Sequence, residues 1–281
     1  MTTGRAPGKV ILAGEHFVVH GAPALAVPLA SRGVEVEVER APGAWDVPAD
    51  VEQHLRRMLG QLEVDPQALT LRLSTDLPVG AGLGGSAAVA VALVRALWPE
   101  ASDAEVCTRA HGLERLAHGN PSGIDGAVAT FARPVWLVRG EAPEVLDGAP
   151  PPGLWVALSA ERTATRDAIA RVADFASARS ARFAAMLTEA RRLVTGSRAE
   201  LLAADWGALG ATMDRVHALL VEVGVSTPAL DGLVNAARGA GALGAKLTGG
   251  GLGGAAIALA PAGLDLGPAL RAAGATEVIA P

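Results

Sequence analysis

Short apolar runs and alternating segments open the chain and predict strands. Residues 7–13 and 24–29 are apolar runs bounded by glycine, and residues 34–39 (VEVEVE) alternate with the period of a half-exposed strand. Residues 51–60 have the pattern of a short helix, and alternation returns at 69–75. The first part of the chain therefore predicts a sheet with a helix inserted between its strands.

Helical patterns dominate the rest of the chain. Small apolar residues from Ser86 to about Trp98 predict a helix behind a glycine-rich turn, and Ser102 with Glu105 forms a capping-box pair that starts another. Later helices are predicted at 164–194, at 198–223, after Ser226-Thr227-Pro228 and, briefly, before the last strand; strands are predicted at 134–139, 154–159, 243–248, 254–260 and 275–279. The acid- and proline-rich stretch 141–153 marks the expected boundary between two α+β domains, residues 1–150 and 151–281.

Composition narrows the class of protein. Half of the 281 residues are hydrophobic, which predicts a globular chain. The net charge of −5 comes without a basic cluster, so we do not expect nucleic acid as a partner. No apolar run approaches the ~18 residues of a membrane span. Arg5, Lys9 and Glu15 interrupt the N-terminal apolar stretch, so it lacks a signal-peptide core. We expect a cytoplasmic protein, and the single Cys107 excludes an intrachain disulfide.

Lysine is rare in this chain. Of the 24 basic residues 22 are Arg, and the two Lys residues, Lys9 and Lys246, both lie beside glycine-rich segments. An ammonium is a compact point charge that suits a phosphate or tunes a neighbouring acid, where the planar fork of Arg would not fit. This pattern predicts a functional role for Lys9. For Lys246 the alternative, a lysine kept by chance and without function, carries more weight.

Residues 78–93, PVGAGLGGSAAVAVAL, carry the strongest chemical signal. Clustered glycines let backbone N–H groups approach an anion, and the helix that follows directs its N-terminal N–H groups toward the same place. No Gly-Lys-Ser/Thr ends the loop and no acid closes a second strand at ribose-binding distance, so neither the Walker nor the Rossmann arrangement applies. The segment predicts a phosphate cradle, with a tight structural turn as the alternative.

Two further segments hold candidate groups. Residues 246–254, KLTGGGLGG, predict either a loop that closes over a substrate or a wide bulged hairpin. Residues 114–125, ERLAHGNPSGID, supply two acids, Glu114 and Asp125. Such a pair suits Mg²⁺ and a reacting hydroxyl, unless both acids only decorate helix ends.

The N-terminal segment holds further candidate residues. Residues 7–21, PGKVILAGEHFVVHG, place Lys9 at a strand edge and Glu15 and His16 just after a glycine turn. Metal binding by His16 and His20 is not expected, because two histidines alone do not make a metal site and need a third ligand nearby. Taken alone, each is more commonly an ordinary core or surface histidine.

These motifs, in this order, resemble those of the GHMP kinase superfamily. The three superfamily motifs read PGKVILAGEH, PVGAGLGGSAAVA and KLTGGGLGGAAIAL here, and the similarity extends over nearly the whole chain. Within the superfamily, GEHFVVHG with Lys at position 9 and ERLAHGNPSGID are most similar to mevalonate kinases. The resemblance implies a two-domain α+β fold with the active site in the interdomain cleft. It also implies ATP and Mg²⁺ as cofactors, phosphorylation of the C5 hydroxyl of mevalonate in isoprenoid synthesis, and compatibility with a homodimer.

The same resemblance assigns roles to individual residues. Asp125 would orient or deprotonate the C5 hydroxyl, and Lys9 would hold that carboxylate ionised. Ser86 and Glu114 would hold Mg²⁺. The ATP phosphates would lie against Pro78, Gly80, Gly82, Leu83, Gly84, Gly85, Ser86 and Ala87. Mevalonate would contact Glu15, His16, Val18, Val19, Thr165, Gly249, Gly250 and Gly251.

The chain also departs from the family pattern. The loop at 40–50 is compact, which puts feedback inhibition by isoprenoid diphosphates in doubt, and Leu252 stands where many relatives carry glycine or a cation. Phosphomevalonate kinase or another small-molecule kinase of the superfamily is one alternative. A catalytically idle nucleotide-binding sensor of the same fold is another, and ADP release that depends on substrate would distinguish an enzyme from such a sensor.

Overall fold

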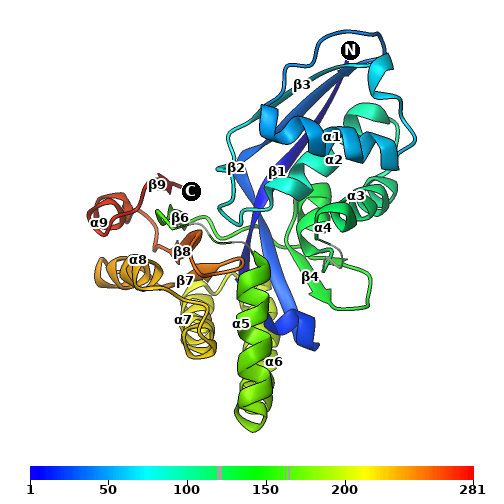
Figure 1. The fold of residues 1–281 in the computed structure, drawn as a ribbon. Helices are drawn as coiled ribbons and strands as arrows, with labels where there is room; N and C mark the ends of the chain where they lie inside the picture. Colours follow the sequence, from blue (N-terminus) through cyan, green and yellow to red (C-terminus); the bar gives the residue numbers. More distant parts are fainter. Residues whose placement is uncertain (119–121, 162, 164) are drawn as a thin grey trace. The chain divides into compact units, whose positions relative to one another are not determined.

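The computed structural model describes residues 1–118, 122–161, 163 and 165–281 (Figure 1). These residues form an α+β fold, as expected, and they group into two compact units. Unit 1 comprises Met1–Lys9, Pro28–Pro78 and Gly84–Ala132, and unit 2 comprises Val10–Val27, Val79–Leu83 and Arg133–Pro281.

Two long strands belong to both units. β1 (Thr2–Ala13) and β2 (Pro23–Glu39) are neighbours in one sheet, and each runs from unit 1 into unit 2. The units are therefore interleaved along the sequence and do not coincide with a single division after residue 150.

Unit 1 combines helices with its part of this sheet. β3 (Thr70–Thr75) pairs antiparallel with β2, and the alternation in VEVEVE buries its valines while its acids are more exposed. The helices are α1 (Ala49–Gln61), η2 (Pro66–Ala68), α2 (Gly85–Leu97), α3 (Asp103–His118) and α4 (Ile124–Phe131). α2 packs against both α3 and α4, because its alanines and valines are small enough to be buried on every side.

Unit 2 contains the other end of the first sheet and a second sheet. β4 (Val135–Val138) pairs antiparallel with the start of β2, and β5 (Glu144–Val145) pairs with β4. The second sheet is antiparallel with the order β7-β8-β6-β9. Its strands are β6 (Leu154–Leu158), β7 (Gly244–Thr248), β8 (Ala255–Leu259) and β9 (Glu277–Ile279). The helices of unit 2 are η1 (Phe17–His20), α5 (Thr165–Ala178), α6 (Ser180–Leu202), α7 (Trp206–Val223), α8 (Pro228–Gly239) and α9 (Gly267–Ala272).

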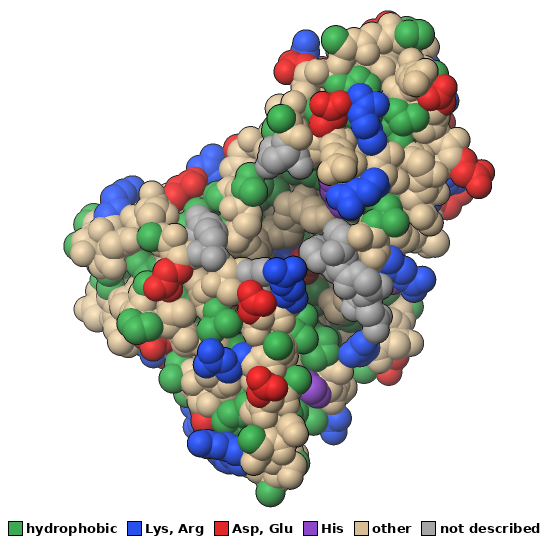
Figure 2. Space-filling view, viewed as in Figure 1, with side chains coloured by type: hydrophobic (Ala, Val, Ile, Leu, Met, Phe, Trp, Pro, Cys, Tyr) green, Lys and Arg blue, Asp and Glu red, His purple; other side chains and the backbone are tan. Residues whose placement is uncertain are grey.

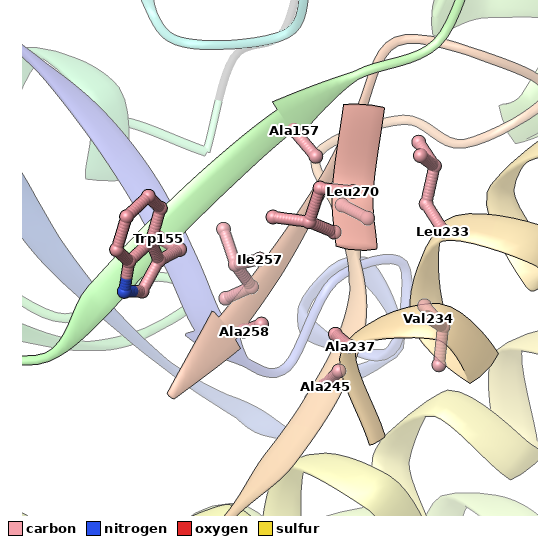
Figure 3. Close-up of a pocket in the computed structure, with 10 residues that line it drawn as sticks. Trp155, Ala157, Leu233, Val234, Ala237, Ala245, Ile257, Ala258 and Leu270 are labelled. Atoms are coloured by element: carbon pink, nitrogen blue, oxygen red, sulfur yellow. The ribbon is translucent and has the colours of Figure 1, made fainter. Parts of the chain in front are cut away.

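The second sheet packs against helices α8 and α9. Figure 3 shows Trp155 of β6, Ile257 of β8, Leu233 and Val234 of α8 and Leu270 of α9 gathered around one small space. This space has no room for a water molecule. We therefore read it as packed core that holds the sheet on its helices, not as a ligand site.

Most elements follow the predicted pattern, but η1, η2 and β5 were not predicted, and the structure differs from the prediction in β2 and in the helices α5 and α6. β2 continues through 30–33, where two strands had been expected. The helical region breaks at Arg179, which has φ −135 and ψ 49, and α6 runs through the expected break between 194 and 198. Ser197 does not end α6, because its hydroxyl donates to the carbonyl of Val194 within the helix.

Charges of both signs are mixed on the surface. Figure 2 shows basic and acidic side chains interspersed over the viewed face. Exposed ion pairs among the described residues include Arg56 with Glu52 and Arg182 with Glu222. Within the described ranges, no helix is both long enough and apolar enough to span a membrane.

Candidate active site

An ion pair between Lys9 and Asp125 lies in unit 1. Lys9 Nζ is 3.2 Å from Asp125 Oδ2, and the side chains are 4% and 33% exposed. Asp125 is in the first turn of α4, which begins after Gly123 at φ 88. The ammonium and the N-terminal end of this helix both place positive charge beside the carboxylate. The fold thus brings together the two residues that had been predicted to be catalytic.

The start of α2 lies against Lys9. A Cβ atom on Gly84 would be 2.8 Å from Cγ of Lys9, and Gly84 has φ 78, so this approach requires glycine. Gly84 is the N-cap residue and offers no side chain, so the first turn, which contains Gly85, Ser86 and Ala87, has no side-chain cap. Uncapped N–H groups at a helix N-terminus suit an anion such as a phosphate.

Glu114 and Ser86 supply two oxygen donors in the same unit. Glu114 is 3% exposed. Burial and the neighbouring Asp125 raise the pKa of Glu114 to about 8, although Lys9 acts in the opposite direction. Glu114 Oε2 and Ser86 Oγ are buried atoms without a hydrogen-bond partner among the described residues. Two hard oxygen atoms of this kind fit Mg²⁺.

Protein carboxylates alone do not make a metal site here. Among the residues that the structure describes, no group of three or more His, Cys, Asp or Glu side chains could hold a metal. Mg²⁺ usually keeps waters and binds one or two protein oxygens together with substrate phosphates. Ser86 and Glu114 each offer an oxygen of the type that such a metal takes from the protein.

Two glycine-rich segments meet within unit 2. A Cβ atom on Gly249 would lie 3.1 Å from the carbonyl oxygen of Gly82, and one on Gly254 would lie 3.2 Å from that of Ala81. Gly82, Gly249, Gly251 and Gly254 all have positive φ, between 72 and 85. The second and third motifs, more than 160 residues apart in the sequence, thus approach each other at backbone distance.

Glu15 and His16 contact the third motif. Glu15, 2% exposed, is ion-paired through Oε1 with Nζ of Lys246, which is fully buried. His16 Nε2–H donates to the carbonyl oxygen of Gly250 at 2.8 Å. Two adjacent residues of the first motif are thus fixed to the strand and the loop of the third motif.

An aromatic cluster supports the segment that follows. Val18 is buried and Val19 half-buried in η1, and the ring of Phe17 stacks on Phe183 of α6 at 6.2 Å between centroids. This packing fixes the predicted walls for the substrate methyl group. Thr165 begins α5, but its side chain lies outside the described part of the chain, as do residues 119–121 of the HGNPSGID segment.

The family model described as GHMP kinases N terminal domain matches residues 49–133, and the model described as GHMP kinases C terminal matches residues 197–275. The chain belongs to the GHMP kinase family. Kinases of this family use ATP, and the resemblance drawn from the sequence motifs is confirmed.

Relatives of this GHMP kinase include mevalonate kinases of two archaea. The enzymes of Thermococcus sibiricus and Pyrococcus furiosus are each 32% identical, over 98% of this chain and 94% of the relative. Among solved structures, L. major mevalonate kinase in complex with R-mevalonate superposes with a TM-score of 0.87 at 28% identity. It covers 100% of this chain and 95% of that one. The predicted two-domain α+β kinase fold is confirmed.

Sequence reasoning on this GHMP kinase missed the residues that brace its third-motif loop. Leu252 N–H donates to the carbonyl oxygen of Val225 at 2.7 Å, and the Thr163 hydroxyl donates to the carbonyl oxygen of Leu252 at 2.6 Å. Gly251 also needs to be glycine, because its Cβ would lie 2.3 Å from the Val225 oxygen. The GVSTP turn before α8 was a usable signal, since its Gly224 ends α7 at φ 87.

Proposed function

We propose that the chain is a mevalonate kinase, which transfers the γ-phosphoryl group of ATP to the C5 hydroxyl of mevalonate and yields 5-phosphomevalonate. The observation that carries the proposal is the Lys9–Asp125 pair, 3.2 Å between Nζ and Oδ2, beside the uncapped start of α2. The names of the relatives that align along nearly the whole chain supply the substrate.

In this mechanism Asp125 acts on the attacking hydroxyl. Its carboxylate accepts a hydrogen bond, and finally the proton, from the C5 hydroxyl as the oxygen attacks the γ-phosphorus atom. Lys9 is a point charge that stabilises the carboxylate and polarises the same hydroxyl. Because phosphoryl transfer needs little covalent help from the protein, positioning and charge account for most of the rate.

The start of α2 binds the nucleotide phosphates in this proposal. The N–H groups of the first turn and of the preceding glycine-rich segment donate to phosphate oxygens. Ser86 Oγ and Glu114 would hold Mg²⁺, and this ion supplies charge neutralisation of the phosphates when it is bound. Because the pKa of Glu114 is about 8, the carboxyl group must release a proton at neutral pH before it can serve as a metal ligand.

Residues of unit 2 bind mevalonate in this proposal. Val18 and Val19 contact the methyl group, and the backbone of Gly249, Gly250 and Gly251 closes the site. Glu15 and His16 contribute from the first motif, and Thr165 from the start of α5. A cytoplasmic location and a homodimer remain predictions; light scattering on the purified protein measures the oligomeric state.

A coupled assay of ADP release tests the substrate. The purified chain is supplied with Mg·ATP and, separately, with mevalonate, 5-phosphomevalonate, galactose or homoserine. We expect release with mevalonate alone. Release with 5-phosphomevalonate instead would reassign the chain to the next step, and ATP binding without release on any substrate would indicate a sensor.

Variants of unit 1 test the assigned roles. Asp125→Asn and Lys9→Met should keep the fold and lower kcat by about 10² to 10⁴. Glu52→Gln is the control, because it removes an exposed ion pair with Arg56 on α1 and should leave kcat unchanged. Full activity of Asp125→Asn would refute the assignment of the base.

A further inference from the structure

Lys246 is buried in a way that packing alone does not explain. Its side chain is 0% exposed, and its ammonium lies among hydrogen-bond acceptors. They include Oε1 of Glu15, the carbonyl oxygen of Leu247 at 2.6 Å and the carbonyl oxygen of Ile11 at 3.3 Å. An ammonium can only donate hydrogen bonds, so a buried one needs acceptors around it, and this environment supplies them. Arg, which the chain uses everywhere except at positions 9 and 246, would bring a larger planar group.

The acceptors of Lys246 connect β7 to the first motif. Thr248, two residues further along β7 and on the same face, accepts from Ile11 N–H at 2.9 Å and donates to the Ile11 carbonyl oxygen at 3.1 Å. β7 and β1 belong to different sheets, so these side chains make the connection that backbone pairing does not make. Glu15 lies at the end of this connection, just before His16.

His16 has a backbone conformation that needs support. Its φ is 59 and its ψ is −45, a positive-φ conformation that non-glycine residues adopt only where their surroundings hold them. The support comes from the ion pair of its neighbour Glu15 and from its own hydrogen bond to Gly250. Both bonds end on the third motif, one on each side of Thr248.

The protonation state of His16 agrees with this geometry. Burial lowers the pKa of His16, the hydrogen bond to Gly250 opposes this, and the charge of Lys246 lowers it further. The ring is then neutral at pH 7, with Nε2–H as the donor to Gly250 and Nδ1 left as an acceptor. The charge of Lys246 thus favours the neutral ring, and the hydrogen bond to Gly250 places the remaining N–H on Nε2.

We propose that Lys246 is a positioning residue for substrate binding: its ammonium fixes Glu15, and through Glu15 it fixes His16 and the Gly249–Gly251 loop in the geometry that binds the substrate. The inference rests on the proposed function for the identity of that substrate. Lys246 itself does not touch substrate. A purely structural ion pair, which only holds the fold together, is the competing explanation.

Three variants and one control separate these explanations. Lys246→Met and Glu15→Gln each leave one buried group without its ionic partner, so both should lose stability. The double variant Glu15→Gln/Lys246→Met removes both charges and should recover thermal stability. Arg238→Met is the matched control, because Arg238 pairs with Asp214 and donates to the carbonyl oxygen of Ala245 on the same strand. Among the described residues it has no hydrogen bond or ion pair to the first motif.

Two readouts are required for each variant. Steady-state kinetics give separate KM values for mevalonate and for ATP. Amide hydrogen exchange of peptides that cover residues 14–21 and 249–254 reports the geometry of the turn and the loop without any substrate. If the wild-type chain does not turn over mevalonate, the proposed function fails, whereas the exchange readout still decides the positioning role.

We expect the double variant to melt near the wild-type temperature, with a KM for mevalonate raised about tenfold or more, since the charge-assisted bonds that fix the turn are gone. Its KM for ATP should stay within about twofold, and exchange at 14–21 should be faster. The control should lose stability with both KM values unchanged. Wild-type KM and wild-type exchange in the double variant would overturn the proposal, as would an equal rise in the KM for mevalonate in Arg238→Met.

Discussion

Replacing Glu114 by Gln tests the buried carboxyl group of unit 1 without changing its shape. In the folded chain this group keeps its proton up to about pH 8, whereas in the unfolded chain it loses the proton near pH 4.5. Between these values the folded state binds more protons, so the stability due to this group is fully present below pH 4.5 and is lost as pH rises toward 8. At about 1.4 kcal/mol per pH unit, the loss from pH 5 to pH 7 is about 3 kcal/mol.

Glu114→Gln has no carboxyl group to titrate at this position. The unfolding free energy of the variant minus that of the wild type should therefore rise by about 3 kcal/mol from pH 5 to pH 7. Urea denaturation with a chelator present, followed by circular dichroism, measures the difference. Glu105→Gln on the same helix is the control: the pKa of Glu105 is lowered by its hydrogen bonds to Ser102, so its contribution is lost as pH falls. Parallel wild-type and Glu114→Gln profiles from pH 5 to pH 7 would refute the reasoning.

Three further substitutions test local geometry. Gly84→Ala places a Cβ 2.8 Å from Cγ of Lys9 at φ 78, so urea denaturation should show a loss of about 1 to 3 kcal/mol, with lower turnover; wild-type stability would contradict it. Leu252→Gly relieves a residue at φ 55 and should raise the unfolding free energy by about 1 kcal/mol; a decrease would show that no strain is stored there. Asp205→Ala removes the acceptor for Ala208 N–H at the start of α7 and should reduce stability by about 1 kcal/mol, and an unchanged Tm would argue against the cap.

Elements with local signals were predictable from the sequence. The capping box of Ser102 and Glu105 forms as expected at the start of α3, with Oε2 of Glu105 accepting from Ser102 N–H at 2.9 Å. Thr227 caps α8 by accepting from Leu230 N–H. The break at Arg179 was not predictable, because no glycine or proline marks it in a segment that reads ASARSARF.

In the candidate site, too, features with local sequence signals were predictable and those set by tertiary packing were not. Glycine positions in the loops were readable, because positive φ and close backbone approach leave few other choices. The pairing of Lys9 with Asp125 followed from family resemblance. The pairing of Lys246 with Glu15 did not, because 231 residues separate the partners and only tertiary packing brings an isolated ammonium to a buried acid. The rarity of lysine drew attention to Lys246 but gave no indication that Glu15 is its partner.

The interleaving of the two units constrains how such genes can recombine. A chimera with one crossover after residue 150 would take the Glu15–His16 turn from one parent and the Gly249–Gly251 loop from the other, although they contact each other inside unit 2. Parents that differ at either place would give mismatched partners at once. Inheritance of residues 10–27, 79–83 and 133–281 as one block keeps every contact of unit 2 within a single lineage. The first and third motifs, although far apart in the sequence, are therefore expected to evolve as a linked pair.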